Sequence, residues 1–418
     1  MNKNSEPNRE SNGDGSFLTH NFRPLLWPHA PTCSPGGSVC RPVSRLRRVV
    51  PAAYAYTAGS ITRAPKSDVN SALCGLLTGL IAVALVLAGN PANMGFCIAC
   101  FLRDTAGALG LHEAEKLAYV RPEIPGLVLG SCAAALCFRE FRPKGGSSPM
   151  LRFVIGFFVM VGALMFLGCP LRMALRLAAG DLNALTALFG FAAGVGIGVV
   201  FLKNGYTLGP SREQNRPEGL AFPALQLALL MILVLFPTLL SFSAEGPGSL
   251  RAPLLLSLAA GLTVGFLAQR SRLCMAGGLR DVMLFGDGTL LLGFAGIFIG
   301  ALALNLLTGQ FHLGFEGQPV AHSDHLWNFL GMALTGLGSV MLGGCPLRQL
   351  ILAGEGNTDS AMAVLGMVAG AAACHNFGLA SSAEGATSNG KIAVALGLLV
   401  LLLLALLLTL KGRKSHAN

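Results

Sequence analysis

The chain has 418 residues, of which 53% are hydrophobic and only 12% are charged, and its mean hydropathy is +0.61. A soluble protein of this length would carry about twice that share of charge, so the composition excludes a soluble globular domain and favours an α-helical membrane protein. The net charge of +10 does not indicate nucleic-acid binding. The basic residues lie in the N-terminal tail and in short loops, where they specify membrane topology.

Residues 1–70 differ from the rest of the chain, because they are rich in Pro, Ser, Asn and Arg and include a basic stretch at 44–48. We predict a disordered basic N-terminal tail on the cytoplasmic side. No apolar core of signal-peptide type precedes residue 71.

Ten apolar segments long enough to cross a bilayer follow, five in residues 71–243 and five in residues 252–410. Because five is an odd number, the second half enters the membrane from the opposite side, as in the inverted repeats of many secondary transporters. The shortest is 124–138, and losing it would change the topology. The expected spans are 71–89, 124–138, 153–168, 183–202 and 222–242, then 252–268, 288–307, 326–343, 360–377 and 392–410.

The distribution of Lys and Arg agrees with this count. Basic residues recur in the loops that the ten-span map places inside, whereas the predicted outer loop 308–325 has no Lys or Arg. We therefore expect a multi-pass protein of the bacterial cytoplasmic (inner) membrane, with both termini cytoplasmic. The C-terminal tail is 411–418.

Two sequence elements occur once in each half, at nearly the same separation. Gly-Cys-Pro-Leu-Arg occupies residues 168–172 and again 344–348, and a Cys-x5-Arg-Asp element occupies 97–104 and 274–281. Each motif segment is too apolar and Gly-rich for a solvated loop, yet too short for a span. We expect re-entrant motif loops that enter from both faces, where non-helical backbone is buried by protein or lines water.

The Gly-Cys-Pro-Leu-Arg elements predict helix starts. Pro170 and Pro346 suit the first residue of a helix, because the missing N–H of proline would be unpaired there. Cys169 and Cys345 would then lie at the N-cap, beside free amides and the positive end of the helix dipole, which attract anions. The supporting glycines are Gly168 and Gly344.

The arginines of the motifs have two interpretations. Arg172 and Arg348, one turn into the expected helices, offer two-pronged hydrogen bonds to an oxyanion, but could equally hold the re-entrant segments in place. The other arginines carry an adjacent carboxylate, which lowers the cost of burying them. These charge pairs are Arg103 with Asp104 and Arg280 with Asp281.

The motifs resemble those of the YeeE/YedE sulfur-transport family, with the best agreement in its YedE branch, which is linked to selenium metabolism. The resemblance rests on Gly-Phe-Cys-Ile-Ala-Cys-Phe-Leu-Arg-Asp at 95–104, on the paired Gly-Cys-Pro-Leu-Arg and on Arg-Leu-Ala-Ala-Gly-Asp-Leu-Asn-Ala-Leu at 176–185. It covers about residues 71–410. It implies uptake across the inner membrane of a small sulfur or selenium compound.

The resemblance also implies a role for thiols. In the thiosulfate-transporting branch, cysteines within the membrane pass the substrate along by weak S–H···S contacts. By motif position that role falls to Cys97, Cys274 and Cys345, with Cys169 as the counterpart of Cys345. The chain departs from a three-cysteine pathway in having Cys at all four positions, and its N-terminal tail has no recognisable counterpart.

We therefore expect a permease for a small sulfur- or selenium-containing compound, with selenite, selenophosphate, thiosulfate and small organoselenium compounds as candidates. No nucleotide-binding motif is present, and we expect no cofactor and no metal. The partners are the lipid bilayer, the substrate and, as a candidate, a cytoplasmic sulfur or selenium carrier protein. The alternatives are a membrane thiol enzyme, in which the cysteines carry sulfur or selenium covalently, and a scaffold for a cytoplasmic sulfurtransferase.

Overall fold

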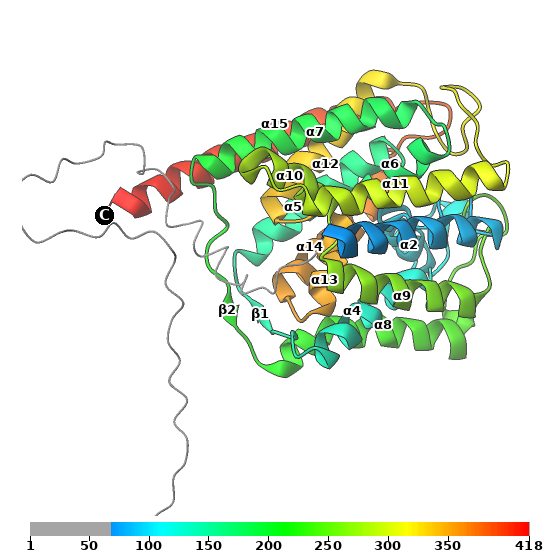
Figure 1. Ribbon diagram of the computed structural model, residues 1–418, viewed down its shortest axis with the longest axis horizontal. Coiled ribbons are helices and arrows are strands. Elements are labelled where there is room, and N and C mark those ends of the chain that lie inside the picture. Colours follow the sequence, from blue (N-terminus) through cyan, green and yellow to red (C-terminus); the bar gives the residue numbers. More distant parts are fainter. Residues whose placement is uncertain (1–67, 418) are drawn as a thin grey trace, which may run out of the picture. The chain divides into compact units, whose positions relative to one another are not determined.

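The computed structural model describes residues 68–417, which form a bundle of α-helices with two very short strands. The predicted disordered tail therefore lies almost wholly outside the described residues. Long helices run side by side in the bundle, and shorter ones lie between them (Figure 1). The first half contains α2 (Asp68–Leu87), α3 (Ile98–Ala108), η1 (Glu115–Leu117), α4 (Glu123–Cys137), β1 (Lys144–Gly145), α5 (Pro149–Met165), α6 (Pro170–Ala178), α7 (Asn183–Lys203), β2 (Arg212–Glu213), α8 (Arg216–Leu235) and η2 (Pro237–Leu239).

The second half repeats this order of long and short helices. It contains α9 (Leu254–Ser271), α10 (Met275–Phe285), α11 (Thr289–Leu307), α12 (His325–Leu342), α13 (Pro346–Gly354), α14 (Thr358–Asn376) and α15 (Ser388–Ala417). The last helix includes residues 411–417, which we expected to form a C-terminal tail. Each of the ten predicted spans overlaps one of these helices.

The structure confirms the predicted apolar helices, but within the described residues fewer than ten of them meet the length and hydropathy of a membrane span. Within residues 68–417, eight helical segments are long and apolar enough to cross a membrane. The two others are α4, which has only 15 residues, and α14, which has 19 but is less apolar. The protein is thus a polytopic α-helical membrane protein, and the ten-span count stays a prediction.

One predicted span was wrong in its bounds. The segment 222–242 was expected to cross the membrane, whereas α8 begins at Arg216 with Pro217 in its first turn and ends at Leu235. Pro237 follows one residue later, and a proline disfavours the helical conformation for the residue before it, here Phe236, which ends the helix. The chain then turns through η2 instead of continuing.

Close contact between glycine-bearing helices holds the bundle together. The main pairs are α2 with α11, α4 with α9, α5 with α14 and α7 with α12, and each joins a helix of the first half to one of the second. In the last pair a Cβ atom added at Gly190 or Gly194 would lie 2.1 or 2.0 Å from a backbone oxygen of α12. Small residues are what allow membrane helices to pack this closely.

The two halves exchange roles in this packing. By order along the chain, α2 and α4 correspond to α9 and α11, and α5 and α7 correspond to α12 and α14. The pair of α2 with α11 therefore has its counterpart in the pair of α9 with α4. In the same way, the pair of α7 with α12 has its counterpart in the pair of α14 with α5. This exchange is what two repeats related by a twofold axis would produce. It supports the predicted inverted repeat, which stays a prediction.

The two Gly-Cys-Pro-Leu-Arg segments lie toward opposite ends of the bundle. The turn after α13 meets β1, where Asn357 pairs with Lys144, whereas the turn after α6 meets the loop after α11, where Asp181 pairs with Gly314. In Figure 1, α13 lies near the end that carries β1 and α6 lies nearer the other end. The fold therefore presents one motif segment toward each end.

Candidate functional site

All four motif cysteines occupy the same position, immediately before a short helix whose first turn is buried. Cys97, Cys169, Cys274 and Cys345 are the N-cap residues of α3, α6, α10 and α13, and Pro170 and Pro346 begin their helices, as the sequence predicts. The four thiol side chains are at most 4% exposed. Each thiol thus lies beside the unpaired amides that open a helix.

The structure brings these thiols together in two pairs, one from each half. The side chain of Cys97 lies beside that of Cys169, and the side chain of Cys274 lies beside that of Cys345. In the first pair, Cys97 Sγ accepts the backbone N–H of Cys100 at 3.3 Å. In the second, Cys274 Sγ accepts that of Gly277 at 3.1 Å. Each pair combines one cysteine from each type of motif.

Arg172 lies against the first pair of thiols and is fully buried. Its guanidinium donates to three backbone carbonyls: to Asn93 O at 3.1 Å, to Val320 O at 3.3 Å and to Leu167 O. It also lies 3.8 Å from Cys100 Sγ. No carboxylate within residues 68–417 forms an ion pair with it, so its hydrogen-bond partners there are backbone carbonyls and the Cys100 sulfur.

The three carbonyls that bind Arg172 belong to residues in strained conformations. Asn93, Leu167 and Val320 have φ of 58°, 63° and 49°, which is the left-handed region that L-residues other than glycine rarely enter. Holding such a residue costs on the order of 1–2 kcal/mol. The guanidinium therefore ties together three strained loops that are far apart in the sequence.

Arg348 occupies the equivalent position in the second half but has a different partner. Its Nη1 lies 3.1 Å from Oε1 of Glu355, and its side chain is 10% exposed. At the place of Glu355 the first half has Ala179. The charge of Arg348 is therefore neutralised by a carboxylate, whereas that of Arg172 is not.

The predicted charge pairs are both present, and they differ in exposure. The carboxylate of Asp104 forms ion pairs with Nη2 of Arg103 at 2.7 Å and with Nη2 of Arg121 at 3.0 Å. All three side chains are at most 3% exposed. Asp281 receives Arg280 at 2.7 Å, with side chains that are 17% and 26% exposed. The motif site of the second half is thus the more open of the two.

The sequence analysis did not single out two buried arginines as site residues, although an arginine within apolar sequence is itself a signal of function in a membrane protein. Arg121 completes the cluster around Asp104, and Arg176 donates to Asp181 at 2.6 Å and to Phe166 O at 2.7 Å. Nη2 of Arg176 has no hydrogen-bond partner within the described part of the chain, although the guanidinium lies over the ring of Phe166. Buried arginines in the first half outnumber buried carboxylates by one; the arginines are Arg103, Arg121, Arg172 and Arg176, and the carboxylates are Asp104, Glu123 and Asp181.

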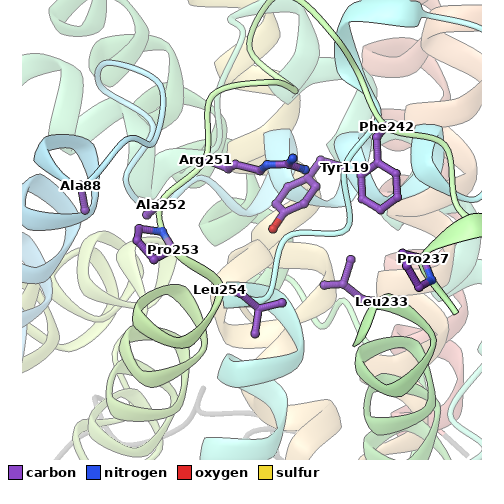
Figure 2. Close-up of a pocket in the computed structure, with 9 residues that line it drawn as sticks. All are labelled: Ala88, Tyr119, Leu233, Pro237, Phe242, Arg251, Ala252, Pro253 and Leu254. Carbon is purple, nitrogen blue, oxygen red and sulfur yellow. The ribbon is translucent and has the colours of Figure 1, made fainter. Parts of the chain in front are cut away.

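A groove of about 610 Å³ opens beside this cluster (Figure 2). Its lining is mostly apolar, but Arg251 lies over the ring of Tyr119, with 4.9 Å from Cζ to the ring centroid. Arg121 contacts the same ring at 5.3 Å. Burial raises the pKa of Tyr119, so its hydroxyl remains a hydrogen-bond donor. The groove thus offers a cation and a hydroxyl next to the buried charges.

Two loop histidines are used within the structure. Nε2 of His322 lies 2.8 Å from Met165 O, and its Nδ1 accepts the N–H of Asp324. Likewise, Nε2 of His112 lies 3.0 Å from Arg103 O, and its Nδ1 accepts the N–H of Ala114. Burial lowers the pKa of both rings, which favours their neutral forms. Within residues 68–417 no three His, Cys, Asp or Glu side chains are grouped so as to hold a metal ion.

The fold and the buried motifs define a polytopic α-helical membrane protein with thiols and guanidinium groups packed at helix starts. Residues 270–414 match the model of the family described as Sulphur transport. The thiosulfate transporter TsuA of Spirochaeta thermophila is 34% identical over 109 residues, which are 25% of this chain and 32% of that protein. The match therefore spans about a third of the relative's length. Both similarities are to sulfur-transport proteins, and both cover only part of the chain.

Proposed function

We propose that this protein is a permease that moves a small sulfur- or selenium-containing anion across the inner membrane, and that its motif cysteines and arginines form the path. The observation that carries the proposal is the pair of buried thiols Cys97 and Cys169 beside Arg172, a buried guanidinium with no carboxylate partner among the described residues. The pair Cys274 and Cys345 would be the second station on the path.

The charge balance of the first site favours an anion. A buried charge without a partner costs several kcal/mol, and an anion that binds beside it recovers part of that cost. The unpartnered Nη2 of Arg176 offers a further donor. Thiols add a contact for polarisable sulfur or selenium, and such contacts are weak enough for the substrate to leave each station.

The difference in exposure between the two halves supports a stepwise path. Asp104 and its arginines are closed to solvent, whereas Asp281 and Arg280 are partly open. In the arrangement of two inverted five-span repeats that we propose, the substrate enters from the outer side, meets Cys97 and Cys169, and passes to Cys274 and Cys345. The thiols of both stations are buried, and the Arg280–Asp281 pair of the second half is the more exposed of the two charge pairs.

The groove at Tyr119 suits the outer mouth of this path. Arg251 would attract an anion from solution, and the ring of Tyr119 separates it from Arg121 and the buried cluster. Clefts lined by charge of one sign raise the local concentration of the opposite ion. The role of the groove in the proposal is capture before the first thiol contact.

The substrate that we propose first is thiosulfate, because TsuA is described as a thiosulfate transporter. Selenite is the second, on the resemblance of the motifs to the selenium-linked branch. We propose transport without catalysis, in which the cysteines make contacts and form no covalent adduct. A cytoplasmic carrier that receives the product would complete the pathway.

The test is uptake of labelled thiosulfate and labelled selenite by uptake-deficient bacterial cells. We expect wild type to accumulate one label, Cys345→Ala to lose that accumulation, and Cys374→Ala to retain it. Cys374 is a matched control, because it is also fully buried but lies in α14, outside the motifs. If Cys345→Ala matches wild type, Cys345 is not on the path. If neither label enters cells whose membranes contain the protein, neither compound is the substrate.

A further inference from the structure

The first thiol pair has a neighbour that the duplicated motifs do not explain. Cys100 lies in the first turn of α3, and its Sγ is 2.8 Å from that of Cys97. Residues three apart in a helix have Cα atoms about 5 Å apart, and a disulfide accepts Cα separations of about 4.4–6.8 Å. A bond between these two sulfurs therefore needs a movement of less than about 1 Å, since S–S bonds are about 2.0 Å long.

Two hydrogen-bond donors lie next to these two sulfurs. Nη1 of Arg172 lies 3.8 Å from Cys100 Sγ, and the amide of Cys100 donates to Cys97 Sγ at 3.3 Å. Both donors stabilise a thiolate, which is the reactive form of cysteine, and they offset part of the cost of burying its charge. A Cys-x-x-C pattern with its first cysteine at a helix start is the arrangement found in dithiol redox sites.

The second half lacks this arrangement. The position equivalent to Cys100 is Gly277, whose added Cβ would lie 3.2 Å from Cys274 Sγ. Cys274 therefore has a partner in the other motif, Cys345, but no cysteine in the first turn of its own helix. The dithiol belongs to the first half alone, so it is not a by-product of the duplication.

We propose that Cys97 and Cys100 are an oxidative modification site, whose reversible disulfide closes the transport path at its first station. The oxidant is a small peroxide such as hydrogen peroxide. One thiolate attacks a peroxide oxygen and becomes a sulfenic acid with release of water. The second thiol then displaces the sulfenic hydroxyl as a second water, so two thiols and one peroxide give one disulfide and two waters. A dithiol reductant reverses the step by thiol–disulfide exchange.

The effect on transport rests on the proposed function, but the modification does not. The disulfide removes the S–H of Cys97, and with it the contact that the substrate is proposed to use. Cys169 loses its neighbouring thiol in the same step. Uptake should therefore fall under peroxide and return with reductant.

The experiment uses the full chain in membrane vesicles, as wild type, Cys100→Ala, Cys97→Ala and the control Cys374→Ala. After treatment with hydrogen peroxide, free thiols are alkylated and the digest is analysed by mass spectrometry. We expect a peptide with both Cys97 and Cys100 unalkylated and joined in wild type and in Cys374→Ala, and its absence from Cys100→Ala or after reduction. Uptake by Cys100→Ala should resist peroxide, whereas that of wild type should fall to the level of Cys97→Ala.

The outcomes separate the two proposals. Alkylation of both thiols after peroxide, or a bond from Cys97 to Cys169 instead, overturns the modification site, and these results need no active transporter. Peroxide sensitivity of Cys100→Ala equal to that of wild type overturns the closing of the path. A wild type that forms the disulfide yet imports neither label retains the modification site and refutes the proposed substrates.

Discussion

Replacement of Arg172 by lysine tests what this buried arginine does. Arg172→Lys keeps the positive charge but presents one ammonium group in place of a planar fork with five N–H donors. One ammonium cannot occupy the positions from which the fork reaches Asn93 O, Leu167 O and Val320 O. We expect two of the three carbonyls to lose their donor.

The magnitude follows from the cost of an unpaired buried carbonyl, about 1–3 kcal/mol each. Two such groups lower the free energy of unfolding by about 2–6 kcal/mol. The left-handed backbone at all three residues is strained, so the loops should change conformation when the guanidinium no longer holds them. A change of 1 kcal/mol moves the melting temperature of a large domain by about 2 °C. The expected loss is therefore about 4–12 °C.

Arg348→Lys is the matched control. Arg348 occupies the equivalent position, but its partner is the carboxylate of Glu355, and both side chains are partly exposed. A lysine can keep such an ion pair, and partly exposed pairs contribute only about 0–1 kcal/mol. We expect a shift of about 2 °C or less for this variant.

The assay is thermal unfolding of the purified protein in detergent, followed by the fraction that remains monodisperse after heating. A large loss for Arg172→Lys with a small one for Arg348→Lys supports the role of Arg172 as a tie between loops. Equal shifts in the two variants would refute that reasoning. Arg172 would then be better explained as a ligand for the transported anion alone.

Three further outcomes are expected. Asp104→Asn should destabilise the protein by about 3–5 kcal/mol, because it leaves two buried arginines without a full counter-charge. Asp281→Asn, at a carboxylate that is 17% exposed, should lower the melting temperature clearly less. Melting temperatures in the reverse order would contradict this expectation. Gly194→Ala should cost about 1–3 kcal/mol of stability, because the added Cβ would lie 2.0 Å from a backbone oxygen. The Cβ added by Gly196→Ala would have its nearest contact at 3.9 Å, so this variant should be neutral or more stable. Equal stabilities of the two variants would refute close packing at Gly194. Arg251→Gln should raise the KM for uptake while kcat stays the same, most strongly at low ionic strength; an unchanged KM would exclude capture at the groove.

Much of the fold could be predicted from sequence because hydropathy is a local property. A run of about 20 apolar residues must form a helix in lipid, since each backbone polar group needs a partner within the segment. The helix starts at Pro170 and Pro346 were equally readable, because proline is favoured at a first helical position. The end of α8 was missed, because the apolar run continues past Pro237 while the helix does not.

The sequence alone was enough to predict a polytopic α-helical protein, the duplicated motifs and the charge pairs Arg103–Asp104 and Arg280–Asp281, because neighbours in sequence are neighbours in space. Only the tertiary structure decided which thiols meet and what balances each arginine. Arg172 donates to carbonyls of residues up to 148 positions away. Arg348, at the equivalent position, donates to the carboxylate of Glu355 instead. Two equal motifs thus acquire different partners, because distant loops supply carbonyls to Arg172, whereas Glu355 at the end of the same short helix supplies a carboxylate to Arg348.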